Sequence, residues 1–148
     1  MNLLLWRHAE AVDSTPDHAR VLTEKGIKQA EKMAGFLRQH LSDDCLMLSS
    51  PALRAQQTIS ALSSNVTVTP ALAPGASVQD VLQTIHWPSA NGMVLVAGHQ
   101  PTLGQVAAHL LDYKNGGFKI KKGAVWWFNR REGSAQTTLR LVISPDLL

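Results

Sequence analysis

The chain has 148 residues, of which 45% are hydrophobic, and its formal net charge is +3. This length and composition suit one domain with a buried core, and lysines spread along the chain, without a basic stripe interleaved with aromatic residues, argue against nucleic-acid binding. A single cysteine, Cys45, excludes an intrachain disulfide and indicates a reducing compartment. No apolar run approaches the ~20 residues of a membrane span or the pattern of a signal peptide. We therefore expect one monomeric, cytoplasmic domain over residues 1–148, with no membrane or nucleic-acid partner.

Short apolar runs alternate with helical patterns through the first half of the chain. Residues 2–6 are predicted to form a buried strand, and the loop 11–22 that follows is rich in turn-forming residues. Thr23 is a typical N-cap, and apolar residues at helical spacing predict a helix over 24–40. A second short strand is predicted at 45–49, and Ser50-Pro51 is a start signal for a helix that runs to residue 62.

The same alternation continues in the second half. Residues 66–69 and 93–97 are predicted strands, and residues 78–86 and 102–111 are predicted helices. Ser77, with Asp80 three residues later, resembles a capping box before the first of these helices. Residues 124–129 and 137–144 are predicted to form a terminal hairpin. The whole pattern predicts a three-layer α/β sandwich, with a mostly parallel central sheet, helices on both faces and an antiparallel terminal hairpin.

Basic and histidine side chains stand where the predicted strands end. Arg7 and His8 follow the first strand, and His99 follows the strand 93–97. The carboxyl ends of parallel strands meet at one edge of the sheet, and ligands bind beyond that edge. Arg54 lies in the first turn of the helix that Ser50-Pro51 starts, so the positive end of that helix dipole faces the same region. We expect these four side chains to share one site.

Two guanidiniums, two imidazoles and a helix N-terminus form a pocket suited to a dianionic tetrahedral group. A neutral imidazole there can attack phosphorus and become phosphohistidine, while the guanidiniums offset the charge on the oxygens. The second histidine can stabilise the phosphoryl group during its transfer. This chemistry requires no metal and no cofactor, and the chain has no carboxylate cluster or Cys/His spacing typical of a metal site.

Four segments, in order, resemble the sequence blocks of the histidine phosphatase superfamily: LLLWRHAEA, LTEKGIKQA, LSSPALRAQQT and VLVAGHQPTL. Together they cover most of the chain. The resemblance implies that His8 is the nucleophile and that Arg7 and Arg54 hold the phosphoryl group. It implies that His99 is the second histidine of the pocket. It also places Arg20 at a basic, substrate-binding position near the site.

The short chain is most similar to the SixA-type phosphohistidine phosphatases of that superfamily. Larger members use the interval between the second arginine and the second histidine for a helical subdomain that carries a catalytic acid. Here the interval has room for little beyond a strand and a short helix, and its only acidic residue, Asp80, marks a helix start. We therefore expect no helical lid. Glu10, next to the first motif, is predicted either to contact substrate or to pair with a nearby arginine.

The absence of a predicted catalytic acid limits which leaving groups the site can release. An alkoxide leaving group needs a proton donor, whereas imidazole, with a pKa near ~6.5, can leave as a neutral ring. We therefore expect hydrolysis of phosphohistidine on a protein, such as a phosphotransfer domain or a phosphocarrier, through a phosphohistidine enzyme intermediate. Glu10, Asp13 and Asp17 remain candidate acids. Two alternatives stay open: a small-molecule phosphomonoesterase using the same pocket, and a non-catalytic module that binds phosphorylated proteins.

Overall fold

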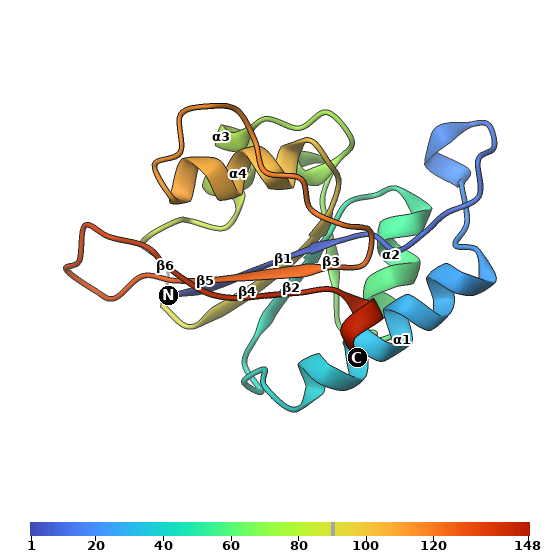
Figure 1. The fold of residues 1–148 in the computed structure, drawn as a ribbon, viewed down its shortest axis with the longest axis horizontal. Coiled ribbons are helices and arrows are strands. Elements are labelled where there is room, and N and C mark those ends of the chain that lie inside the picture. The colour runs from blue at the N-terminus through green and yellow to red at the C-terminus, as the bar shows by residue number, and fades with distance from the viewer. Residues whose placement is uncertain (90) are drawn as a thin grey trace.

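A single six-stranded sheet runs through the computed structural model, which describes residues 1–89 and 91–148 (Figure 1). Its strands, in spatial order, are β3 (Thr67–Val68), β2 (Leu46–Ser49), β4 (Met93–Gly98), β1 (Asn2–Arg7), β5 (Val125–Asn129) and β6 (Thr138–Ile143). The first four are mutually parallel, and β5 and β6 pair antiparallel at one side. The predicted mostly parallel sheet with an antiparallel terminal hairpin is confirmed.

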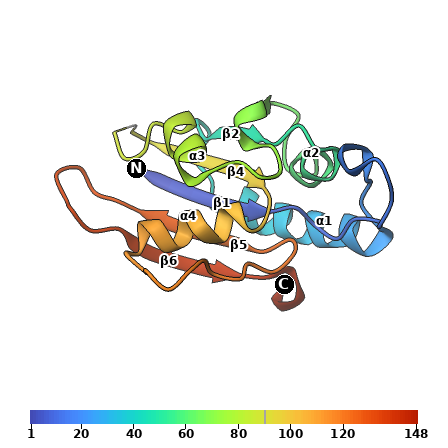
Figure 2. The ribbon, with the colours of Figure 1, turned by 90° about the horizontal axis from the view of Figure 1, so that it is seen from above.

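Helices cover both faces of this sheet, which makes three layers (Figures 1 and 2). On one face lie α1 (Glu24–Arg38) and α2 (Leu53–Ser60), and on the other lie α3 (Val78–Thr84) and α4 (Thr102–Leu110). Short 3-10 turns complete the fold: η1 (Asp17–Ala19), η2 (Pro70–Leu72) and η3 (Pro145–Leu147). Within residues 1–89 and 91–148, none of the helices has the length and apolarity to cross a membrane.

The first strand is apolar on both sides because both sides are covered. Leu3 and Leu5 pack into the core beneath α3 and α4, while Leu4 and Trp6 pack into the core beneath α1 and α2. All four side chains are fully buried. A central parallel strand of this kind has a continuous apolar run instead of an alternating one, which is why the segment LLLW ends only where the sheet ends.

Side-chain caps mark the starts of α1 and α3. The Thr23 side chain accepts a hydrogen bond from the Gly26 N–H, and Ser77 and Asp80 form the predicted capping box. The predicted start of the next helix at Ser50-Pro51 is wrong: α2 begins at Leu53. The Ser50 hydroxyl accepts from the Ala52 N–H ahead of the helix, because the chain must first turn away from β2.

The remaining predicted bounds agree within two residues, and the differences have local causes. The helix predicted over 78–86 ends at Thr84, because His86 has a φ of 54°, which a right-handed helix cannot accommodate. The strand predicted over 66–69 shrinks to β3, since its only described partners are the last two residues of β2. The predicted loop 11–22 contains η1 and is closed by a bridge between Ala11 and Leu22.

Close approach of α1 to the segment after β1 requires a glycine. A Cβ atom at Gly26 would overlap the carbonyl oxygen of Glu10. Gly26→Ala therefore forces the helix and the segment apart, and we expect the free energy of unfolding, measured by urea denaturation, to fall by about 1–3 kcal/mol.

Gly35→Ala in the same helix is the matched control. A Cβ at Gly35 meets no atom within 4 Å, and alanine favours a helix interior over glycine by about 0.5–1 kcal/mol. The free energy of unfolding should therefore rise. Equal effects of the two substitutions would contradict the close packing at Gly26.

Candidate active site

Two histidines meet at the carboxyl ends of the central strands. β1 and β4 pair in register up to Arg7 and Gly98, and the His8 N–H donates to the Gly98 carbonyl at 3.0 Å. The residues that follow each strand therefore lie side by side. The ring centroids of His8 and His99 are 5.2 Å apart, and the two side chains are only 7% and 3% exposed. The two rings are therefore adjacent in the structure, as predicted.

The His8 ring is held in one tautomer. Its Nδ1 lies 2.8 Å from the backbone carbonyl of Ala9. A carbonyl oxygen only accepts hydrogen bonds, so Nδ1 carries the proton and Nε2 keeps a free electron pair. Burial lowers the pKa of His8 to about 4; the Ala9 hydrogen bond opposes this shift, and the charges of Arg54 and Arg7 add to it. At neutral pH the ring is uncharged, and Nε2 is the nitrogen with an available electron pair.

The His99 ring is held by a serine hydroxyl. Its Nε2 lies 2.7 Å from Oγ of Ser50, which is fully buried and also accepts from the Ala52 N–H. Burial, the neighbouring His8 and the charge of Arg54 lower the pKa of His99 to about 3. The local sequence pattern indicates only a helix start at Ser50. Its position at the end of β2, which is hydrogen-bonded to β4 beside His99, is the signal that could have revealed this contact.

The two predicted arginines are held by different hydrogen-bond acceptors. Arg7, at the end of β1, donates from one terminal nitrogen to the carbonyl of Ile120 at 2.7 Å. Burial lowers its pKa, but a guanidinium remains charged in proteins. Arg54, in the first turn of α2, is 4% exposed. Its two terminal nitrogens donate to Asp17, one to the carbonyl at 2.9 Å and one to the carboxylate at 3.2 Å.

Buried nitrogens without hydrogen-bond partners show where this site can accept hydrogen bonds from, or donate them to, a ligand. Across residues 1–89 and 91–148, three buried side-chain nitrogen or oxygen atoms have no hydrogen-bond partner: Arg7 Nε, Arg54 Nε and His99 Nδ1. All three belong to the four predicted site residues. A buried polar atom without a partner is costly and is typical of a functional site. Two guanidinium donors and an imidazole nitrogen suit the oxygens of a tetrahedral oxyanion.

The other predicted site residues point to other partners. Glu10 accepts from the Thr23 hydroxyl at 3.0 Å and lies 3.9 Å from the Lys25 ammonium, both at the start of α1. Its predicted pairing with an arginine is thus replaced by a lysine. Arg20 donates to the Val12 carbonyl and to the Asp17 carboxylate. Asp13 is exposed on the same loop.

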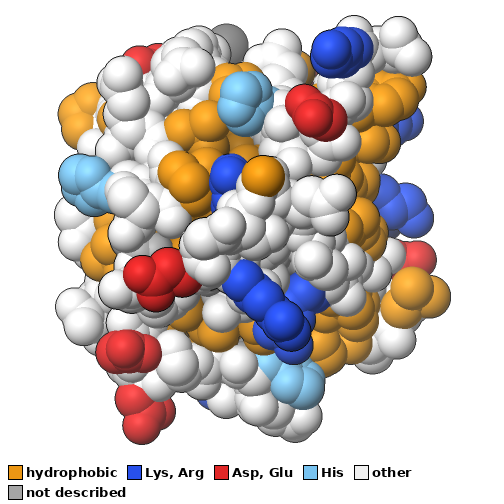
Figure 3. All heavy atoms as spheres, turned by 90° about the vertical axis from the view of Figure 1, so that its left-hand side faces the viewer, with side chains coloured by type: hydrophobic (Ala, Val, Ile, Leu, Met, Phe, Trp, Pro, Cys, Tyr) orange, Lys and Arg blue, Asp and Glu red, His pale blue; other side chains and the backbone are white. Residues whose placement is uncertain are grey.

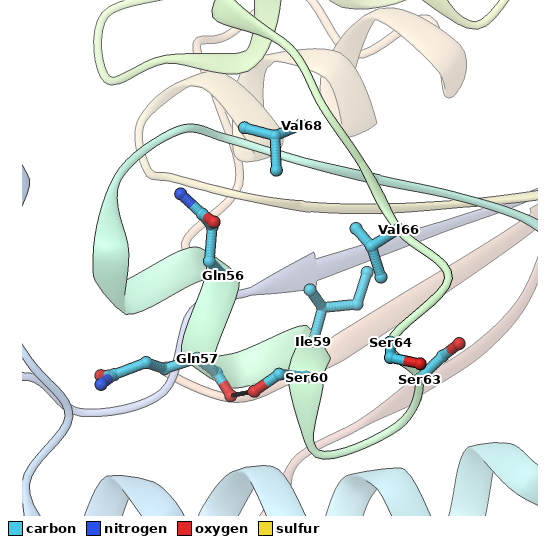
Figure 4. Close-up of a pocket in the computed structure, with 8 residues that line it drawn as sticks. All are labelled: Gln56, Gln57, Ile59, Ser60, Ser63, Ser64, Val66 and Val68. Carbon is cyan, nitrogen blue, oxygen red and sulfur yellow. Dashed lines mark hydrogen bonds between the residues drawn. The ribbon is translucent and has the colours of Figure 1, made fainter.

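Two other hollows in the described part of the chain have different linings. A groove of about 280 Å³ beside α2 and β3 is lined by valines, an isoleucine, serines and glutamines, with no titratable group among them (Figure 4). A cleft at the opposite end of the sheet includes Arg130 and Arg131, where Arg130 donates to the Ser134 carbonyl. Figure 3 faces that end, where basic side chains are interspersed with acidic and apolar ones. In the part of the chain that the structure describes, no three His, Cys, Asp or Glu side chains are grouped to hold a metal.

Comparison with known proteins agrees with this geometry. The family model described as histidine phosphatase superfamily (branch 1) matches residues 3–77. The phosphohistidine phosphatase SixA homolog of Haemophilus influenzae is 30% identical, and the match covers 78% of this chain and 80% of that protein. The phosphohistidine phosphatase SixA of Escherichia coli is 32% identical, and the match covers 74% of each chain.

A solved structure extends the likeness to the whole chain. The protein histidine phosphatase SixA complexed with tungstate has a TM-score of 0.84 to this fold at 28% identity, and the match covers 99% of both chains. The family match spans the strand that ends in Arg7 and the helix that carries Arg54. The chain belongs to the histidine phosphatase superfamily and is a phosphatase of the SixA type.

Proposed function

We propose that this phosphatase hydrolyses phosphohistidine on proteins and that the reaction passes through a covalent phosphohistidine on His8. One observation carries the proposal. The three buried nitrogens that lack partners, on Arg7, Arg54 and His99, belong to the side chains grouped with a neutral nucleophilic ring. A phosphoryl group supplies the oxygens that these nitrogens need, at the place where the His8 Nε2 electron pair is available.

In the first step the phosphoryl group passes from one imidazole to another. The electron pair of His8 Nε2 forms a bond to phosphorus as the bond from phosphorus to the substrate ring breaks. A substrate ring protonated on its other nitrogen leaves as neutral imidazole. His8 becomes an imidazolium whose Nδ1–H still donates to the Ala9 carbonyl, which stabilises that charge. Arg7 and Arg54 offset the charge of the phosphoryl oxygens throughout.

In the second step water replaces His8. The water oxygen bonds to phosphorus, the N–P bond breaks, and its electron pair returns to Nε2. His8 recovers its neutral Nδ1–H tautomer, and dihydrogen phosphate leaves with both water protons. The enzyme must therefore cleave a phosphohistidine in every turnover, whatever its substrate. A substrate with the same P–N bond needs no additional catalytic group. A phosphate ester needs an acid that protonates its alkoxide leaving group.

The acidic side chains near the site support the same substrate class. Asp17 is held between Arg54 and Arg20, and these hydrogen bonds and charges outweigh burial and lower its pKa. It is therefore ionised and has no proton to give. Glu10 is bound to Thr23 and lies near Lys25. Neither carboxylate is arranged as the donor that an ester would require.

The interval between Arg54 and His99 supports a protein substrate. It supplies β3, η2, α3 and β4, and α3 packs into the sheet core through Val81 and Leu82. These elements build the core, and we infer that none of them forms a lid. All six strands share one sheet, so we likewise infer one domain over 1–148. A histidine displayed on a phosphotransfer domain or a phosphocarrier could then reach His8, in line with the substrates named for the SixA relatives.

Removing the nucleophile should abolish turnover. We expect His8→Ala to lower the rate of phosphate release from a histidine-phosphorylated protein, assayed with a chelator present, by at least about 10³-fold. Rapid acid-free quenching of the unaltered enzyme should trap an acid-labile, base-stable phosphoryl group that the variant lacks. His109→Ala, which removes an exposed histidine of α4, is the matched control. Normal activity of His8→Ala, or faster turnover of phosphate esters than of phosphohistidine, would exclude the proposal.

The state of the His8 ring predicts a pH dependence. Because its pKa is lowered to about 4, the reactive neutral form is retained as pH falls from 7 to about 5 and is lost near pH 4. Long-range ¹H–¹⁵N spectra at pH 7 should show a proton on Nδ1 and none on Nε2, with His8→Ala assigning the signals. Titration of His8 should lower kcat/KM only below about pH 5, whereas protonation of the substrate ring acts over pH 7–5. A ring protonated on Nε2 at pH 7 would contradict the assigned nucleophile.

A further inference from the structure

We propose that Asp17 is a positioning residue for Arg54, and that Arg20 acts on the phosphoryl group through Asp17 and not by touching it. The inference rests on the proposed function, because it concerns how the oxyanion site is kept in shape. It gives roles to a carboxylate and a guanidinium that make no described hydrogen bond to either histidine.

The Arg54 guanidinium is held on one side only. Both of its terminal nitrogens donate to Asp17, to the backbone carbonyl at 2.9 Å and to Oδ2 at 3.2 Å. The third nitrogen, Nε, is buried and has no partner. Asp17 lies 37 positions earlier in the chain, on η1, so only the tertiary fold brings the two together. Because a guanidinium is planar, hydrogen bonds from its two terminal nitrogens fix the direction in which the Nε–H points.

Arg20 completes this arrangement from the exposed side. Its terminal nitrogen donates to Oδ1 of Asp17 at 3.3 Å, and its Nε donates to the Val12 carbonyl at 2.8 Å. The Asp17 carbonyl also accepts from the Arg20 N–H, which closes the η1 turn. The carboxylate thus joins a partly exposed arginine to a buried one, with one oxygen for each. Described contacts of the Arg20 side chain all lie within the loop 11–22.

The two ion pairs differ in environment. The side chain of Asp17 is 60% exposed, that of Arg20 is 24% exposed, and that of Arg54 is 5% exposed. An exposed pair is screened by water and contributes little by itself. Removing the Asp17 carboxylate takes one of the two acceptors from the buried Arg54 guanidinium, which leaves one unsatisfied donor and lets the group turn about the backbone hydrogen bond that remains. The Arg54 contact is therefore the one through which Asp17 influences the site.

Two explanations predict opposite changes in anion affinity when the Asp17 side chain is removed. Asp17 is a negative charge beside a site for a dianion, so deleting it would tighten anion binding if charge alone mattered. If Asp17 sets the direction of Arg54, deleting it weakens binding. Tungstate is the probe, since it is a tetrahedral oxyanion that a SixA relative binds and its affinity is measured without turnover.

The decisive experiment compares tungstate affinity, by isothermal titration calorimetry, with kcat and KM on a histidine-phosphorylated protein. We expect Asp17→Ala to weaken tungstate binding about tenfold, the loss typical of a charge-assisted hydrogen bond, and to lower kcat. Asp17→Asn should recover most of both, because its amide oxygen still accepts from Arg54. Glu24→Gln, which removes the same charge from the exposed first turn of α1, should bind tungstate as the unaltered chain does.

A double-mutant cycle tests the part played by Arg20. If Arg20 acts through Asp17, Arg20→Ala and Asp17→Ala together should cost little more than Asp17→Ala alone. Fully additive losses, tighter or unchanged tungstate binding by Asp17→Ala, or no recovery in Asp17→Asn would overturn the inference. Circular dichroism and thermal melts establish that each variant is folded, and Asp17→Asn keeps the test valid if Asp17→Ala unfolds. If the unaltered chain neither binds tungstate nor releases phosphate, the proposed function itself has failed.

Discussion

The whole site depends on the parallel pairing of β1 with β4. The two strands come from opposite ends of the first hundred residues, and their register places Arg7 beside Gly98. The next residue on each strand is a histidine. A shift of one residue in this pairing would separate the two rings and turn the apolar side chains of β1 to the wrong faces. The same backbone hydrogen bonds therefore organise the core and bring His8 beside His99.

Burial has two effects on the histidines that follow these strands. It lowers the pKa values of both rings, to about 4 for His8 and about 3 for His99, so both are uncharged at neutral pH. Burial also makes a ring nitrogen without a hydrogen-bond partner costly in free energy. Ala9 and Ser50 satisfy one nitrogen of each ring. An oxyanion beside the rings favours their protonated forms, so anion binding and proton uptake by His99 should be coupled.

The cations of the site are oriented by backbone and carboxylate groups that lie far away in sequence. Arg7 is held by the Ile120 carbonyl, and Arg54 is held by Asp17. In both cases Nε is left buried and unpaired. The fold thus retains unsatisfied donors where a stable core would have none, and the surrounding strands and helices supply the stability that this costs. An active site of this kind is pre-organised for charge that arrives with the ligand.

Local patterns in the sequence determined the elements of this protein and the residue types of its site. The apolar run 3–6, the Thr23 cap and the Ser77–Asp80 capping box each act over a few residues, and the structure has all three. The four residues Arg7, His8, Arg54 and His99 could be singled out because they follow strands or begin a helix.

Tertiary structure alone decided the contacts that give those residues their properties. The His8 tautomer, the Ser50 hydroxyl on His99, and the hold of Asp17 on Arg54 are side-chain contacts, and the last two join segments 49 and 37 positions apart. No local propensity encodes such pairs, because they depend on strand register and on the path of the loop 11–22. The start of α2 differs from its prediction for the same reason. Ser50 has the local pattern of a helix cap, but its hydroxyl accepts from the Ala52 N–H ahead of the helix and also contacts His99.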